Sequence, residues 1–64
     1  MNRVQYFTVR LSSYSRVKEI REWADVNGVG FWWNGENAYD YTFLTDECTM
    51  ALIKLKFGEM YVVR

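Results

Sequence analysis

The sequence predicts an α+β domain in which four short strands and two helices follow one another in the order βαββαβ. Three observations indicate it. Apolar and polar residues alternate near the N-terminus, apolar residues recur at helical spacing in two longer segments, and Asn34-Gly35 separates two aromatic-rich runs. Side chains alternate between faces in a strand and share a face every three or four residues in a helix, so each pattern identifies one kind of element. The 64 residues have the length of a single domain, residues 1–64.

The first strand and the first helix lie within residues 3–28. In "RVQYFTVRL" apolar residues alternate with more polar ones, as is typical of a strand with one solvent-exposed face. The apolar residues are Phe7, Val9 and Leu11, and the more polar ones are Tyr6, Thr8 and Arg10. Helical spacing follows in Val17, Ile20, Trp23 and Ala24. We expect Ser15 to cap the start of this helix and Asn27-Gly28 to end it, because both residues of that pair tolerate the left-handed conformation.

A β-hairpin is predicted where "VGFWW" and "NAYDYTFL" flank Asn34-Gly35, a pair that favours tight turns because both residues accept positive φ. In the second run Tyr39, Tyr41 and Phe43 share one face. We expect that face to lie under the helices.

The loop length decides which rings of the first run face the helices. A loop of two or four residues places Trp32 in the core and turns Phe31 and Trp33 to the open face of the sheet. A three-residue loop, residues 33–35, does the reverse and exposes Trp32. We favour the three-residue loop, because Val29, Phe31 and Trp33 together form the more regular core. In either case at least one tryptophan lies away from the helix-covered face.

The second helix is predicted over residues 45–58, and the run "EMYVVR" after it reads as a closing strand. Thr45 is the expected N-cap, acidic residues follow in the first turn, where the helix dipole favours anions, and Gly58 ends the helix. Two lysines also alternate with apolar residues here as they would in a strand, which leaves open that the helix ends near Ile53.

Two apolar stripes lie on opposite sides of this second helix. The expected core stripe includes Cys48 as a small buried residue, and consists of Cys48, Ala51, Leu52 and Leu55. The opposite stripe consists of Met50, Ile53 and Phe57. A soluble monomer does not normally keep both stripes apolar, so the second is a possible homodimer or partner surface if the helix reaches Phe57. If the helix ends near Ile53, that stripe becomes ordinary core.

The element order closes most simply into a ferredoxin-like two-layer sandwich, a four-stranded antiparallel sheet with two helices on one face, because each crossover prefers the right hand. In that arrangement strands 1 and 3 are central, and strand 2, which holds Phe31, Trp32 and Trp33, lies at an edge. An outward Trp32 has two interpretations. It anchors a partner, or it is partly covered by long neighbours such as Arg10, Tyr6 and Arg64 and serves the fold alone.

The composition argues against catalysis. There is no histidine, the commonest general base and transition-metal ligand, and one cysteine with scattered carboxylates makes no zinc site. Gly28 and Gly30 form a GxG that opens a strand and not a helix, so it presents no helix N-terminus to a phosphate. We therefore expect a chain that is not an enzyme and that uses no cofactor and no metal.

Charge and hydropathy favour a soluble, cytoplasmic protein with no membrane partner. The chain lacks a secretory signal pattern, and no apolar run approaches the roughly 20 residues of a membrane span. Eight basic and eight acidic residues give zero net charge, which argues against a general polyanion binder.

The stretch "ALIKLKFG", residues 51–58, follows "FLTDE" and resembles the tail of many very small uncharacterised proteins encoded by bacteriophages. Those proteins also pair an aromatic-rich hairpin with an acidic turn and a lysine-bearing segment ending in Phe-Gly. The likeness covers about the last third of the chain, which here continues with "EMYVVR". The resemblance implies a phage accessory protein that binds and modulates a component of the host cytoplasm.

Three functions are consistent with these residues. The first is a non-catalytic module that binds a host protein or its own copy through Trp32, Phe31, Trp33, Tyr6 and Arg10, with the edge strand free to pair with a second chain. The second is binding of single-stranded nucleic acid, with Tyr6 and Trp32 stacking on bases and Arg10 or Arg3 holding phosphate. The third is capture of a small ligand, such as a signalling nucleotide, at a dimer interface.

Overall fold

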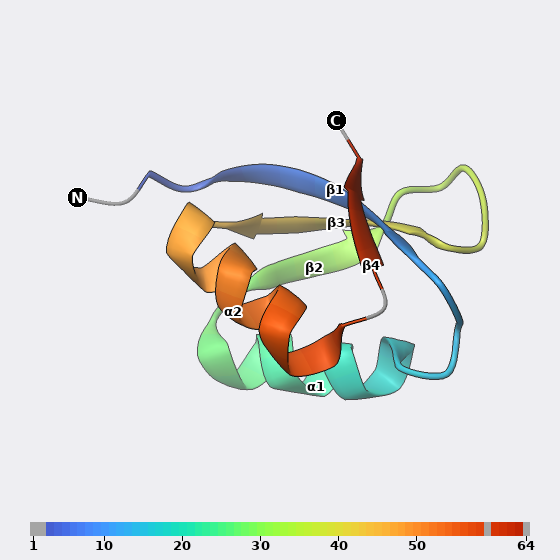
Figure 1. Cartoon of the computed structure of the whole chain (residues 1–64), viewed down its shortest axis with the longest axis horizontal. Helices are drawn as coiled ribbons and strands as arrows, with labels where there is room; N and C mark the ends of the chain where they lie inside the picture. Colours follow the sequence, from blue (N-terminus) through green and yellow to red (C-terminus); the bar gives the residue numbers. More distant parts are fainter. Residues whose placement is uncertain (1–2, 59, 64) are drawn as a thin grey trace.

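Four strands and two helices form a two-layer sandwich in the predicted order (Figure 1). The computed structural model describes residues 3–58 and 60–63. The elements are β1 (Gln5–Leu11), α1 (Val17–Asn27), β2 (Gly30–Trp33), β3 (Asp40–Thr45), α2 (Glu47–Phe57) and β4 (Met60–Val63). The strands pair antiparallel in the order β2-β3-β1-β4, and both helices cover one face. The ferredoxin-like prediction is confirmed, with β1 and β3 central and β2 at an edge.

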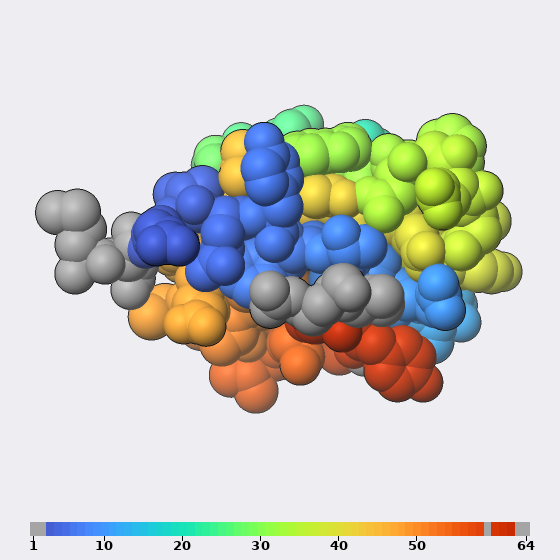
Figure 2. All heavy atoms as spheres, turned by 90° about the horizontal axis from the view of Figure 1, so that it is seen from above, coloured from blue at the N-terminus to red at the C-terminus, as the bar shows by residue number. Residues whose placement is uncertain are grey.

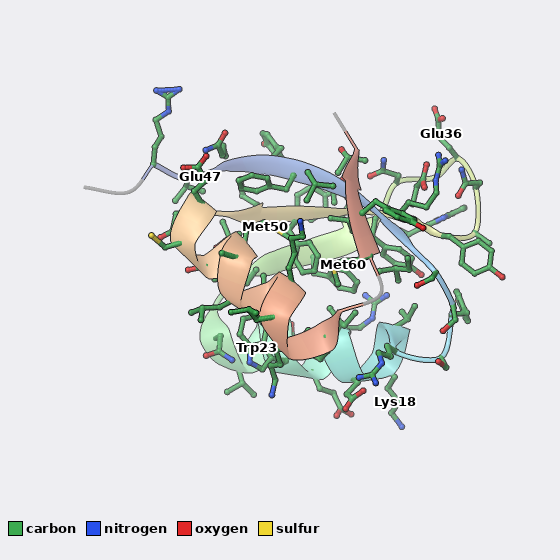
Figure 3. The ribbon with its side chains drawn as sticks, in the orientation of Figure 1. Lys18, Trp23, Glu36, Glu47, Met50 and Met60 are labelled. Atoms are coloured by element: carbon green, nitrogen blue, oxygen red, sulfur yellow. The ribbon has the colours of Figure 1, made fainter. Side chains whose placement is uncertain are left out.

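The hydrophobic core fills the space between the sheet and the helices. Phe43, Ile20, Ile53 and Val9 are its largest fully buried side chains, one from each of β3, α1, α2 and β1. Met50 of α2 and Met60 of β4 also point into this layer (Figure 3). Because every described element except β2 contributes a buried apolar side chain to one cluster, the cluster holds the two layers together.

Helix α1 ends as predicted but begins differently. Gly28 adopts a left-handed conformation (φ 69°), and its N–H donates to the last carbonyls of the helix. The predicted Ser15 cap is wrong. Arg16 holds the N-cap position without a side-chain capping bond, and the Ser15 hydroxyl lies 2.8 Å from that of Ser13. The serines bond to each other in the turn, which is the competing use of such side chains.

Helix α2 runs the full length to Phe57, so the strand-like alternative for its second half is wrong. Its N-cap is Asp46 and not Thr45, because the Asp46 carboxylate accepts a 2.7 Å hydrogen bond from the Thr49 N–H. A carboxylate at this position also interacts favourably with the helix dipole. Gly58 follows at positive φ (59°) and its N–H donates to the Lys54 carbonyl.

The two apolar stripes of α2 are placed the opposite way round from the prediction. Met50, Ile53 and Phe57 are buried against the sheet and α1, so they are core residues and the prediction that they form a dimer surface is wrong. The stripe expected in the core, Cys48, Ala51, Leu52 and Leu55, is exposed. Both stripes are apolar, so the periodicity of the sequence does not show which of them faces the core. The Met, Ile and Phe side chains fill the layer better, and the Phe57 ring also meets the Trp23 ring edge-on, with ring centroids 5.9 Å apart.

The hairpin has the predicted face assignment but a longer loop. Phe31 pairs with Phe43 and Trp32 with Thr42, so Phe31 faces the helices and Trp32 faces the open side, as the odd loop requires. The connection between the last paired residues of the hairpin, Trp33 and Tyr41, however, comprises residues 34–40, so it is odd in length but longer than predicted. The three-residue loop is therefore wrong. Tyr39, expected under the helices, is an exposed loop residue instead.

Truncations on opposite faces of α2 test which of its two apolar stripes packs in the core. Ile53 is 0% and Leu55 83% exposed. We expect Ile53→Ala to lower the free energy of unfolding by about 2–5 kcal/mol, since it leaves a cavity in the core. Leu55→Ala, which removes the same number of carbon atoms, should change it by at most about 0.5 kcal/mol. Urea denaturation of both variants measures the difference, and equal losses would contradict the assignment.

Candidate functional site

The open face of the sheet carries a small apolar group, Tyr6, Trp32 and Leu44, called the open-face cluster below. The Tyr6 and Trp32 rings meet edge-to-face with centroids 6.1 Å apart. Tyr6 of β1 and Gly30 of β2 both pair with Leu44 of β3, so the cluster spans three strands. Tyr6 is 69% and Trp32 40% exposed. The interaction between the rings thus leaves much of both in contact with solvent.

Gly30 lets the Trp32 indole lie along the edge strand. A Cβ atom at Gly30 would sit 3.1 Å from Cζ3 of Trp32 and 3.0 Å from Cβ of Leu44, which is closer than such atoms normally approach. The indole covers the backbone of Gly30, an arrangement known to stabilise glycine at a sheet edge. Trp32 is therefore held over the sheet by its own strand and by Tyr6.

Both helices pack on the opposite side of the sheet, so nothing in the described chain covers the open-face cluster. Figure 2, seen from above, shows the blue atoms of β1 across this face and green atoms of β2 farther toward its upper edge, beyond β3. The described open-face side chains other than Arg10 and Asp40 are uncharged.

Arg10 and Asp40 form a bidentate ion pair on the open face of the sheet. The Arg10 Nε and Nη2 atoms donate to the two carboxylate oxygens of Asp40 at 2.8 and 3.1 Å. Asn37 Nδ2 donates a further bond to Asp40 at 3.0 Å. The hydrogen bond from Arg10, aided by its charge and by Asn37, lowers the pKa of Asp40 although burial opposes the shift. Arg10, predicted to contact a partner, is thus already engaged within the chain.

The hairpin loop is braced by the same asparagine. The Asn37 Oδ1 atom accepts a bond from the Tyr39 N–H at 3.0 Å, and the Asn37 carbonyl accepts one from Nε1 of the Trp33 indole at 2.7 Å. At the start of the loop the Thr42 hydroxyl donates to the Asn34 side chain. These bonds fix the loop and the Trp33 ring relative to β3.

A cleft of about 610 Å³ opens on the helix side of the hairpin. Its lining residues are Tyr14, Arg21, Trp33, Ala38, Tyr39 and Tyr41. Trp33 is 52% exposed, because it lies beyond the part of the sheet that the helices cover. Phe31, by contrast, is half-buried against the core. The structure therefore separates the predicted binding residues: Tyr6, Arg10 and Trp32 lie on the open face, and Phe31 and Trp33 on the other side.

The buried Tyr41 ring lies behind the cleft, stacked on Phe31 with centroids 5.0 Å apart and planes 10° from parallel. Burial, and then a hydrogen bond with Tyr14, raises the pKa of Tyr41. The Arg21 guanidinium lies over the other ring of this stack, 5.6 Å from the Phe31 centroid. The cleft thus combines aromatic surface with one cation.

Sequence reasoning missed this cleft. Tyr39 was expected in the core, and no local pattern brings it together with Tyr14 and Arg21. The one available signal was the number of rings between residues 28 and 43, more than a small core needs.

No metal-binding group of three or more His, Cys, Asp or Glu side chains occurs within residues 3–58 and 60–63. In the same part of the chain, neither helix has the length and hydropathy to cross a membrane. Comparison of the chain with protein-family models, curated proteins and solved structures gives no match. The side chains available at the two surfaces are suited to binding, through rings, hydroxyls and one cation.

The pKa of Asp40 gives a test of the ion pair. Because this pKa is lower in the folded than in the unfolded chain, the stabilisation is present above about pH 4 and is lost as the pH falls through the folded value. We expect Asp40→Asn to be less stable than the wild type at pH 7 and to lose less stability on acidification. Urea denaturation at pH 7 and pH 3 measures both.

Asp25→Asn is the matched control, because it removes an exposed carboxylate from α1. It should follow the wild type at both pH values. An Asp40→Asn variant whose acid sensitivity equals that of the wild type would show that the ion pair contributes nothing to stability.

Proposed function

We propose that this chain is a non-catalytic binding protein that docks a protein partner on the open-face cluster. The observation that carries the proposal is the exposed, edge-to-face pair of Tyr6 and Trp32 on the helix-free side of the sheet. Large rings bury much area at a low cost in conformational entropy, and for that reason they dominate binding energies at protein interfaces. Their fixed geometry over Gly30 lowers the cost of ordering them further.

The edge of β2 adds a second element of recognition. Only β3 pairs with β2 among the described strands, so the other side of β2 presents backbone groups. An extended peptide can add to such an edge, with main-chain hydrogen bonds giving affinity and neighbouring side chains giving specificity. Trp32 belongs to this edge strand, so a peptide added there would lie beside the open-face cluster.

The charges of the open face favour a protein over single-stranded nucleic acid. Arg10, the cation expected to hold phosphate, forms a bidentate ion pair with Asp40. Nucleic-acid binding draws much of its affinity from Lys and Arg side chains that neutralise phosphates and so release the counterions condensed around them. A neutral, aromatic surface suits an apolar or polar protein surface better.

The setting we propose is that of a small phage accessory protein that binds and modulates a host protein in the cytoplasm. This part of the proposal rests on the likeness of residues 51–58 to such proteins.

Removal of one indole from each side of β2 tests the proposal. Immobilised wild-type chain is incubated with bacterial lysate, and the captured proteins are compared with those bound by Trp32→Ala and Trp33→Ala. We expect Trp32→Ala to lose the specific protein and Trp33→Ala to retain it, because only Trp32 belongs to the open-face cluster. Truncation of a half-exposed ring should cost about 1–2 kcal/mol of stability, so circular dichroism must first show that both variants are folded.

Tyr6→Ala, which alters a more exposed ring, provides a second variant with less effect on stability. Capture of the same protein by Trp32→Ala and Tyr6→Ala at wild-type levels would contradict the proposal.

A further inference from the structure

We propose that the cleft on the helix side of the hairpin is a second binding site, which takes a flat aromatic ligand bearing an anionic group and about the size of a mononucleotide. This site is separate from the open-face cluster, because Trp33 and Tyr41 point to the opposite side of the sheet from Trp32. The inference therefore does not depend on the function proposed above.

The size and lining of the cleft suit a planar ligand. Small-molecule sites commonly have volumes of about 300–1,000 Å³, and this cleft has about 610 Å³. Tyr14, Trp33 and Tyr39 are all exposed, although each lies at the same cleft. A flat ring inserted between them would cover apolar surface that the fold leaves open. Rings also prefer stacked or edge-to-face contacts with other rings, which such a ligand supplies.

The charge at the cleft selects an anion. Arg10 and Arg16 each pair with a carboxylate, whereas no carboxylate in the described part of the chain lies within ion-pair distance of Arg21. Glu36, at the tip of the hairpin, points away from α1 (Figure 3). The Arg21 guanidinium is stacked over Phe31 and has hydrogen-bond donors left to bind a phosphate or carboxylate.

The walls of the cleft are already in place. The Trp33 indole is held by its 2.7 Å bond to the Asn37 carbonyl, and Tyr39 by its backbone bond to the Asn37 side chain. The Tyr41 hydroxyl carries no charge at neutral pH, because an ordinary phenol has a pKa of about 10 and burial raises the pKa of this one, so the back of the cleft does not repel an anion. A ligand therefore does not have to order the loop in order to bind.

Titration of the full chain followed by NMR tests the site. The probes are the four common nucleoside monophosphates, the matching nucleosides, inorganic phosphate and N-acetyltryptophan. We expect a saturable shift of the Trp33 indole N–H signal with at least one aromatic anion. The nucleosides and inorganic phosphate, which lack the anion or the ring, should bind at least tenfold more weakly.

Comparison of the nucleotides with N-acetyltryptophan identifies the source of the anion as a phosphate or as a peptide carboxylate. Saturable binding of either class supports the proposal. If no aromatic anion shifts the Trp33 signal at millimolar concentration, or if inorganic phosphate binds as tightly as any nucleotide, the proposal is overturned.

Two substitutions on α1 give the matched comparison. Arg21→Gln should weaken binding at least tenfold. Lys18→Gln removes the same charge one turn earlier from a side chain that points into solvent, and should leave binding unchanged (Figure 3). Equal effects of the two would mean that only net charge matters and would overturn the site. Trp32→Ala should retain ligand binding, which separates this test from that of the protein-docking surface.

Discussion

The antiparallel register of β2 against β3 is the constraint on which both proposed binding surfaces depend. Phe31 lies opposite Phe43, and alternation then sends Trp32 to one side of the sheet and Trp33 to the other. A shift of one residue would bury Trp32 and expose Phe31. The register thus decides which ring joins Tyr6 on the open face and which lines the cleft.

Polar contacts at the base of the hairpin maintain this register. Asp40, the first residue of β3, binds Arg10 of the central strand and Asn37 of the loop, and Asn37 in turn holds Trp33. One network therefore connects the two faces, although their surfaces differ in chemistry. The open face neutralises its own charges, whereas the cleft keeps a cation beside aromatic rings. This difference in chemistry is the reason why we propose a different kind of ligand for each face.

Local patterns were sufficient to predict the elements, and the topology that they imply places β2 at an edge. Periodicity left two directions open for Trp32, and the favoured outward direction is confirmed by the register. Each of these predictions depends on periodicity or on the topology that short crossovers allow. The predictions were wrong where the sequence allows two local arrangements of similar energy. The stripes of α2 are both apolar, so only packing against the sheet selects Ile53 over Leu52, and Asp46 and Thr45 are both acceptable caps. Loop length failed because Asn37 and Asp40, and not Asn34-Gly35 alone, shape the turn.

The cleft lay beyond sequence reasoning for a different reason. Tyr14 and Arg21 come from the turn before α1 and from α1 itself, whereas Tyr39 comes from the hairpin loop, and only tertiary structure brings that loop beside α1.

An NOE spectrum of the protein in solution tests the register most directly. With the register described, the Trp32 indole protons give cross-peaks to the Tyr6 ring, and the Phe31 ring gives cross-peaks to Tyr41 and Phe43. Cross-peaks from Trp32 to Tyr41 or Phe43, with none from Phe31 to either, would contradict it.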